Sequence, residues 1–419
     1  MEKQGQMEDG MPRTVVLVGA LDTKGAEFAF VKRLIEQRGV KTLTVDVGVL
    51  GEPAFLPEVG RDEVARAGGG ELAELVSGDR KDLAMQTMGA GLTAVVRRLY
   101  EEGRLDGILG MGGTGGTSIA TAAMRALPVG VPKVMVSTVG GGDVSAYAGG
   151  KDITFVPSIV DVAGINRISR TVFARAAGAI AGMVEIDVPP AADERALIAA
   201  SMFGNTTQAV DRVRSQLEER GFEVLVFHAT GIGGRTMESL IAGGFFAGSL
   251  DLTTTELADY VCGGVFDAGA ERGLAASRTG VPAVLAPGCV DMANFGAAET
   301  VPARYHDRLL YQWNPNVTLL RTDVEENRRI GELLAVAANA ATGRVAVLLP
   351  LGGVSMLDSP GQPFWDPVAD GACFAAIREN LRPDIPVEEL DLNINDPAFA
   401  DRAVDLLVEL INEGATETG

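Results

Sequence analysis

Short runs of apolar residues, rich in Val, Leu and Ile, recur along the chain and end near Gly, Ser, Thr, Asp or Asn. Because the runs are continuous rather than alternating, they predict strands that are covered on both faces. Residues 26–39 and 207–221 place apolar side chains three and four apart and predict helices that stop at glycine. Alternating strands and helices predict a parallel sheet with right-handed crossovers. The runs begin at Thr14, Thr42, Gly107, Lys133, Ala196, Val224, Ala283, Val317 and Val345.

The two halves of the chain resemble each other. The matching positions are Gly19 with Ser201, Arg38 with Arg220, Asp46 with His228 and Gly130 with Gly280, and residues 152–182 match residues 316–343. This repeat predicts an α/β fold of two doubly wound, Rossmann-like domains with parallel sheets, related by internal duplication. The domains would span residues 14–187 and 194–419, joined near the prolines of residues 185–194. Residues 1–13 are polar and glycine-punctuated and predict a disordered tail.

Composition narrows the functional classes. Apolar residues make up 47% of the 419 positions, yet the chain has no apolar run of the length that a membrane helix needs and no export leader. The net charge of −20 disfavours nucleic-acid phosphates and anionic lipid surfaces as partners. Cys262, Cys289 and Cys373 are widely spaced, which is typical of neither a disulfide framework nor a zinc site. We therefore expect a cytoplasmic protein that holds any anion through local features such as backbone amides.

Five glycines crowd into residues 110–116, directly after a predicted strand and directly before a predicted helix. Gly110, Gly112 and Gly115 satisfy the Gly-x-Gly-x-x-Gly pattern, but no acidic residue follows at the distance that a dinucleotide ribose requires. The Gly-Lys-Ser/Thr of a P-loop is also absent from the sequence. Two interpretations remain: the glycines let amides approach a phosphate or carboxylate, or they serve tight turns and close packing of helix on sheet.

Because the predicted strands are parallel, the other loops that follow them converge on the same sheet edge. Ligands of open parallel sheets bind at this edge, beyond the carboxyl ends of the strands. Lys24 could meet a phosphate there, and Asp22 or Asp143 could hold Mg²⁺, although each could equally be a solvated surface charge. The full predicted cofactor-binding set is Asp22, Thr23, Lys24, Gly112, Gly113, Thr114, Gly115, Gly116, Thr117, Ser137, Thr138, Gly141, Asp143, Asn166 and Arg167.

Eleven segments spread over nearly the whole chain carry a family pattern: residues 21–25, 110–138, 142–144, 152–170, 226–241, 250–259, 290–296, 314–322, 343–355, 363–367 and 393–400. With these segments the sequence resembles the UPF0261 family, also described as Tm-1-like ATP-binding proteins. The resemblance implies two α/β subdomains, ATP binding by the N-terminal one, and self-association into a homo-oligomer. Because a TIM-barrel-like region follows in the plant member, it also implies a separately encoded TIM-barrel partner for this chain.

The sequence departs from the family pattern at three places. Gly140, Gly141 and Gly142 stand where Ala-Ser-Gly is usual, and Trp313 and Asn393 stand where relatives tend to have histidine. If those histidines carry protons in relatives, their loss implies a different substrate or lost activity.

The second half offers His228, Glu256 and Asp291 as candidates for proton transfer, and Arg235 and Asn294 as candidates for substrate binding. His228 ends a predicted strand and could equally be bonded to backbone. Glu256 could instead close a capping box with Thr253. His306 is interpreted as a residue on a helix face, and Cys289 as a buried, inert thiol rather than a nucleophile.

The leading functional interpretation is an ATP-binding protein, with ATP-dependent transfer or ligation of a small anionic metabolite in the interdomain cleft as its reaction. The first alternative is a non-enzymatic module in which the nucleotide gates binding to another protein. The second is an enzyme of sugar phosphates or dinucleotides that does not use ATP.

Overall fold

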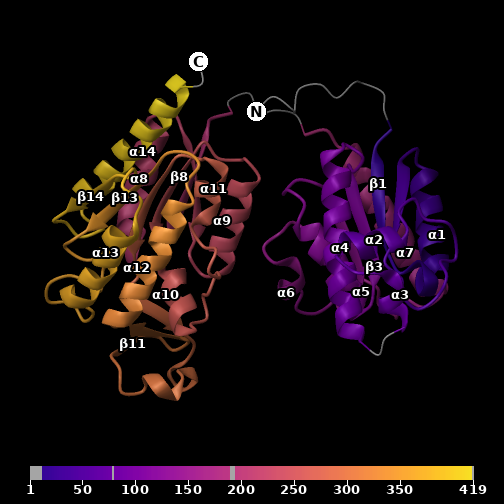
Figure 1. Cartoon of the computed structure of the whole chain (residues 1–419), viewed down its shortest axis with the longest axis horizontal. Helices are drawn as coiled ribbons and strands as arrows, with labels where there is room; N and C mark the ends of the chain where they lie inside the picture. The colour runs from indigo at the N-terminus through magenta and orange to yellow at the C-terminus, as the bar shows by residue number, and fades with distance from the viewer. Residues whose placement is uncertain (1–11, 78–79, 189–193, 418–419) are drawn as a thin grey trace. The chain divides into compact units, whose positions relative to one another are not determined.

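The computed structural model describes residues 12–77, 80–188 and 194–417 and divides the chain into two units, Met1–Pro190 and Ala191–Gly419 (Figure 1). The expected tail lies mostly outside the described residues, as does the centre of the expected join. Arg13 is held in place, since its carbonyl accepts from the Lys41 amide at 2.8 Å and its guanidinium pairs with Asp187 at 2.9 Å.

The N-terminal domain is built on five parallel strands in the order β2-β1-β3-β4-β5. Side chains of β1 alternate between two cores: Val15 and Leu17 face one, and Val16 and Val18 face the other. The continuous apolar run is therefore explained by burial on both faces. The strands are β1 (Thr14–Gly19), β2 (Lys41–Asp46), β3 (Gly107–Gly112), β4 (Lys133–Ser137) and β5 (Thr154–Pro157).

Helices cover both faces of this sheet. On one face α1 (Leu21–Glu36) packs beside α7 (Arg167–Glu185), and on the other α4 (Lys81–Glu101) packs beside α5 (Thr114–Arg125). The short helices are α2 (Arg61–Ala67), α3 (Leu72–Ser77) and α6 (Ser145–Ala148).

Strand order places a topological switch point between β1 and β3, because α1 follows β1 on one face of the sheet and α5 follows β3 on the other. Ligands of doubly wound sheets bind in the crevice at such a point, beyond the carboxyl ends of the strands. The glycine-rich loop follows β3 and the segment of Asp22 and Lys24 follows β1. Both thus begin at the switch point.

The C-terminal domain has a parallel sheet in the order β14-β13-β9-β8-β6-β7. Counted from its own first strand, this order is 2-1-3-4-5-6, so its first five strands repeat the N-terminal topology. The strands are β6 (Leu197–Met202), β7 (Glu223–His228), β8 (Gly248–Thr253), β9 (Ala283–Gly288), β13 (Val345–Pro350) and β14 (Val387–Leu390).

A small antiparallel sheet is inserted after β9. It consists of β10 (Met292–Phe295), β11 (Leu310–Asn314) and β12 (Val317–Arg321) in the order β10-β12-β11. The apolar run at Val317 is therefore a strand, as predicted, but it belongs to this insertion and not to the parallel sheet.

Helices α8 (Thr207–Glu219) and α14 (Pro397–Glu417) share one core of the C-terminal domain. The opposite face is covered by α9 (Ile232–Ala242), α10 (Thr255–Cys262), α11 (Leu274–Thr279), α12 (Val324–Asn339) and α13 (Pro367–Asn380), of which α10, α12 and α13 stand at the front in Figure 1. Helix α14 lies beside the first helix of its domain as α7 does. By its position, α14 is therefore the structural counterpart of α7. The sequence match of residues 152–182 with residues 316–343 instead pairs α7 with α12, which lies on the opposite face of its sheet. None of the described helices is long and apolar enough to cross a membrane.

Phe28 tests the packing of α1 on the N-terminal sheet. Its side chain is fully buried, and a Cβ at Gly19 would lie 2.2 Å from its ring. We expect Phe28→Ala to lower the free energy of unfolding of this domain by about 3–5 kcal/mol, since it leaves a cavity. The half-buried Phe30 on the same helix is the matched control, and Phe30→Ala should cost clearly less. Equal shifts of the urea midpoint in the two variants would contradict this packing.

Candidate functional site

Helix α5 begins at the switch point without a side-chain cap. Its N-cap residue is Gly113, in extended backbone conformation, and the Thr117 amide donates to the Gly113 carbonyl at 2.8 Å. Within the described part of the chain, the amides of Thr114, Gly115 and Gly116 find no acceptor. The positive end of the helix dipole lies at these three amides, so α5 presents a ready-made anion-binding group.

The glycine run divides into packing positions and open positions. A Cβ at Gly110 would lie 2.8 Å from the Ala120 Cβ, and one at Gly112 would lie 3.0 Å from the Gly116 Cα. These two glycines let α5 lie close against the sheet. A Cβ at Gly113 would meet only the Thr138 hydroxyl, at 3.8 Å. The packing interpretation is therefore confirmed for Gly110 and Gly112, while the space at Gly113 is open.

The loops after β4 and β5 form a second part of the same edge. An open hollow of about 530 Å³ is lined by Thr138, Gly141, Pro157 and residues 158–161. Within it, Ile159 has a φ of 66° and is 72% exposed. A β-branched residue in this conformation is strained, and such strain is concentrated at ligand-binding sites. We refer to residues 113–116 together with residues 138–143 as the glycine edge.

Two predicted binding residues are turned toward each other instead. The hydroxyls of Thr117 and Ser137 are buried and 2.7 Å apart, and Ser137 also accepts from the Val139 amide at 3.1 Å. They fasten α5 to β4. Thr114, Thr138 and Gly141 are exposed at the rim.

The start of α1 is fixed by acidic residues. One Asp22 oxygen accepts from the amides of Leu50 and Gly51 at 2.8 and 3.0 Å, and the other is buried without a hydrogen-bond partner among the described residues. Asp46, at the end of β2, accepts from the amides of Leu21 and Gly48, both at 2.9 Å. Burial raises the pKa of Asp46. Unlike α5, α1 thus has its first amide occupied.

Lys24 points to the loop after β5, where its ammonium donates to the Val162 carbonyl. Glu27 accepts from the Gly164 amide of the same loop. Thr23 is exposed beside them. Sequence reasoning identified Lys24 but not Glu27, whose position inside a predicted helix gave no functional signal.

The expected metal ligands lie on separate segments, Asp22 in the first turn of α1 and Asp143 in the loop after β4. Asp22 follows β1 and Asp143 follows β4, and β3 lies between these strands. Asp143 accepts from the Ser145 amide at 2.9 Å, and its hydrogen bonds with Ser145 lower its pKa. In the described ranges no three His, Cys, Asp or Glu side chains form a group that could hold a metal. Mg²⁺ would need phosphate oxygens in addition, as is usual for this ion.

Asn166 and Arg167 stand at the start of α7. The Asn166 side chain accepts from the amides of Ile168 and Ser169, both at 2.9 Å, and so caps this helix. Arg167 is exposed, and within the described residues its side chain has no hydrogen-bond or ion-pair partner.

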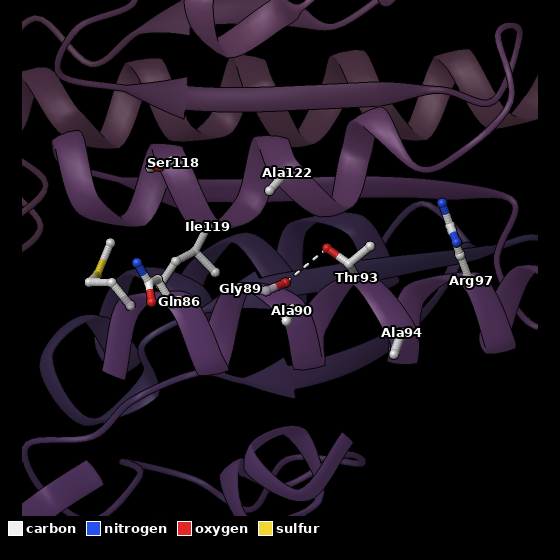
Figure 2. Close-up of a pocket in the computed structure, with 10 residues that line it drawn as sticks. Gln86, Gly89, Ala90, Thr93, Ala94, Arg97, Ser118, Ile119 and Ala122 are labelled. Carbon is white, nitrogen blue, oxygen red and sulfur yellow. Dashed lines mark hydrogen bonds between the residues drawn. The ribbon is translucent and has the colours of Figure 1, made fainter. Parts of the chain in front are cut away.

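Figure 2 shows a separate groove of about 580 Å³ between α4 and α5. It is lined mainly by small and apolar side chains, among them Ala90, Ala94 and Ala122, and the Thr93 hydroxyl donates back to the Gly89 carbonyl at 2.8 Å. Only Arg97, at one end, carries charge. Its lining does not suit a phosphate.

In the C-terminal domain, Glu256 of α10 is fully buried, and its carboxylate lies at the N-terminus of α9. One carboxylate oxygen accepts from the amides of Gly231 and Gly234 at 2.6 and 3.0 Å, and the other accepts from Arg272 at 2.6 Å. The anticipated capping box with Thr253 is absent, because the Thr253 hydroxyl instead meets the Thr206 hydroxyl at 2.8 Å. The Glu256 carboxylate therefore supplies the negative charge at the N-terminus of α9.

Arg272 holds three carboxylates in the core. It pairs with Asp251, Glu256 and Glu238, the last at 3.1 Å, and its side chain is 1% exposed. Burial alone would lower the pKa of Arg272, but Asp251 and Glu256 outweigh it and raise the pKa. Removing one member of such a buried network leaves an uncompensated charge. The sequence around Arg272 carried no signal of this role.

Asp291 lies in a second buried acidic group. It accepts from the Ser355 hydroxyl at 2.8 Å, and its other oxygen has no partner in the described residues. Burial and the nearby Asp358 raise its pKa to about 7, while Arg321 opposes the shift. Burial likewise raises the pKa of Asp370, which pairs with Arg321 at 2.7 Å, to about 8.

The predicted substrate residues differ in access. Asn294 is buried and donates to Asp259 at 2.7 Å. Arg235 is exposed and donates to the Asp267 carbonyl at 2.7 Å. His228 is also exposed, its ring 5.4 Å from that of Phe203.

The remaining second-half residues are accounted for locally. His306 bonds the Val301 carbonyl at 3.0 Å, and burial raises the pKa of the Cys289 thiol. Asn393 donates to the carbonyls of Ser355 and Asp358 at 3.1 and 3.0 Å, and so holds the loop after β13.

Comparison with known proteins identifies both domains. Residues 13–189 match the N-terminal domain and residues 195–411 the C-terminal domain of the Uncharacterised protein family (UPF0261). A UPF0261 protein of Clostridium tetani is 46% identical over 96% of this chain and 100% of its own length. The ToMV resistance protein Tm-1(GCR237) of Solanum lycopersicum is 41% identical over 79% of this chain and 45% of its own length.

Similarity to a solved structure is weaker. A putative UDP-N-acetylglucosamine 2-epimerase from Listeria monocytogenes is 10% identical, covers 66% of this chain and 79% of its own, and has a TM-score of 0.24. A score this low carries no functional conclusion.

The buried acids predict a pH dependence. Asp291 and Asp370 bind protons more tightly in the folded state than in the unfolded state, where the model-peptide value of 3.8 applies. Their contribution to stability is complete below that pH and is lost as the pH rises toward their folded values. We expect the free energy of unfolding of the C-terminal domain to fall between about pH 4 and pH 8. Asp291→Asn should make the fall shallower.

Asp405→Asn is the control, since Asp405 pairs with Arg220 at the surface. Urea unfolding at several pH values measures the slopes. Equal slopes in the wild-type chain and Asp291→Asn would show that Asp291 is ionised in the fold.

Proposed function

This chain belongs to the UPF0261 family, and we propose that its N-terminal domain binds ATP through its phosphates at the glycine edge. The proposal rests on one observation: the three free amides at the start of α5, at the switch point of the sheet. A chain with a net charge of −20 repels anions at long range, so close contacts must supply the attraction. Backbone amides at a helix N-terminus do this without basic side chains.

The surrounding residues fit a triphosphate. Thr114 and Thr138 offer exposed hydroxyls, and Arg167 is an exposed cation without a partner in the described residues. Lys24 would exchange the Val162 carbonyl for a phosphate oxygen. The unpartnered oxygen of Asp22 suits Mg²⁺ held jointly with phosphates, with Asp143 as the other candidate ligand.

The C-terminal domain narrows the possible chemistry. Of the three predicted proton carriers, Glu256 and Asp291 are buried in networks of their own, and His228 alone is exposed. ATP-dependent transfer or ligation on a small anionic metabolite would therefore depend on His228 for proton transfer. The same observation favours a second candidate function. In it the chain is a non-enzymatic module in which bound ATP gates binding to another protein.

Strand order argues against a dinucleotide enzyme. The dinucleotide fingerprint occupies the first strand-to-helix turn of its domain, where the pyrophosphate meets the helix. Here the glycine loop follows β3, the third strand along the chain.

Gly113→Val tests the proposal directly. The added side chain would stand beside the free amides of α5, while the extended backbone and the 3.8 Å distance to Thr138 let the fold accept it. Losing one or two charge-assisted hydrogen bonds should weaken MgATP binding by at least about tenfold in calorimetric titration.

Gly60→Val is the matched control, because Gly60 is the uncapped, extended N-cap residue of α2, with no atom within 4 Å of its Cβ position. It should bind MgATP like the wild-type chain. Unchanged affinity in Gly113→Val, with an unchanged unfolding midpoint, would refute binding at the glycine edge.

A further inference from the structure

Aromatic side chains gather at one corner of the C-terminal domain. The Phe203 ring lies 5.4 Å from His228 and 6.1 Å from Phe266, and the Tyr311 ring lies 6.4 Å from Trp313. The two groups meet at Gly204, because a Cβ there would lie 3.9 Å from the Trp313 ring. We call these five side chains the aromatic corner. Only 5% of the chain is aromatic, so this concentration requires a reason.

The aromatic corner stands at the carboxyl ends of β6 and β7. Phe203 follows the last residue of β6, and His228 is the last residue of β7, in register with Met202. The switch point of this sheet lies between β6 and β8. Phe203 therefore occupies the position where doubly wound sheets bind ligands.

The corner is open at its outer members. Trp313 is 42% exposed, and His228 and Gly204 are exposed as well. Among the described residues, neither the Trp313 indole nor the His228 imidazole has a hydrogen-bond partner. The exposed Trp313 and His228 rings, beside a glycine that carries no side chain, therefore leave room for a planar ligand.

Anion-binding groups are scarce at this corner. The Gly231 and Gly234 amides of α9 are bonded to Glu256, and the Asn294 side chain is bonded to Asp259. Arg235 is tied to the carbonyl of Asp267, next to Phe266. Attraction here must come from ring faces and from the imidazole edge.

We infer that the aromatic corner binds the planar heteroaromatic ring of a small molecule, stacked against Trp313 and bonded at its edge by His228. Stacking on aromatic side chains is favourable for every nucleobase, because each base has a π face. The inference concerns the C-terminal domain alone and does not depend on phosphate binding at the glycine edge.

Adenosine is the probe, because it carries a purine but no phosphate, and sodium triphosphate is its counterpart without a ring. Trp365→Phe leaves Trp313 as the sole tryptophan, so quenching of its fluorescence reports a ring beside it. We expect adenosine to quench this fluorescence saturably and triphosphate to leave it unchanged. In calorimetry, Trp313→Leu should weaken adenosine binding by about tenfold, and His228→Ala should also weaken it.

Gly113→Val separates this site from the glycine edge, and its adenosine affinity should equal that of the wild-type chain. Urea unfolding of Trp313→Leu checks that the exposed substitution leaves the fold intact. Absence of quenching, or adenosine binding that Trp313→Leu does not change, would overturn the inference. A changed sedimentation coefficient of Trp313→Asp, together with no adenosine binding by the wild-type chain, would also overturn the inference. That result would identify the aromatic corner as a protein interface.

Discussion

Helices that begin at the edge of a parallel sheet leave amides without acceptors, and this constraint organises both domains. In the C-terminal domain Glu256 meets the requirement for α9, and Arg272 compensates the buried carboxylate. In the N-terminal domain Asp46 accepts from the first amide of α1, and Asn166 accepts from an amide in the first turn of α7. Helix α5 has no such residue. Its counterpart by strand order in the C-terminal domain is α10, which follows the third strand of that sheet and also has no side-chain cap.

The proposed anion binding by so acidic a chain depends on the same difference between capped and uncapped helices. Many of its carboxylates are solvated or already paired, and in the group around Arg272 the side chains of Asp251 and Glu256 are buried. The field of α5 is local and falls off within its first turn, so it acts only on a ligand in contact. The aromatic corner complements it, since ring stacking requires no net charge on the protein.

Much of the fold could be predicted from the sequence, because continuous apolar runs and helical periodicity report burial directly. The repeated α/β architecture followed from the same patterns, whereas the family followed from the resemblance of particular motifs. The insertion of β10, β11 and β12 could not be foreseen, since an apolar run does not identify its pairing partner. For the site, the sequence located the loops but not the partners: it could not show that Thr117 faces Ser137, or that Glu256 faces Arg272. Ile159 gave no signal, because its strain is a property of the backbone.

We propose that the α5 amides contact the bound anion, and amide NMR can detect this contact. With ¹⁵N-labelled protein titrated with ATP, the account predicts saturable downfield shifts of the Thr114, Gly115 and Gly116 amides, larger than any in the C-terminal domain. Binding of ATP that leaves these three amide resonances unmoved would contradict it.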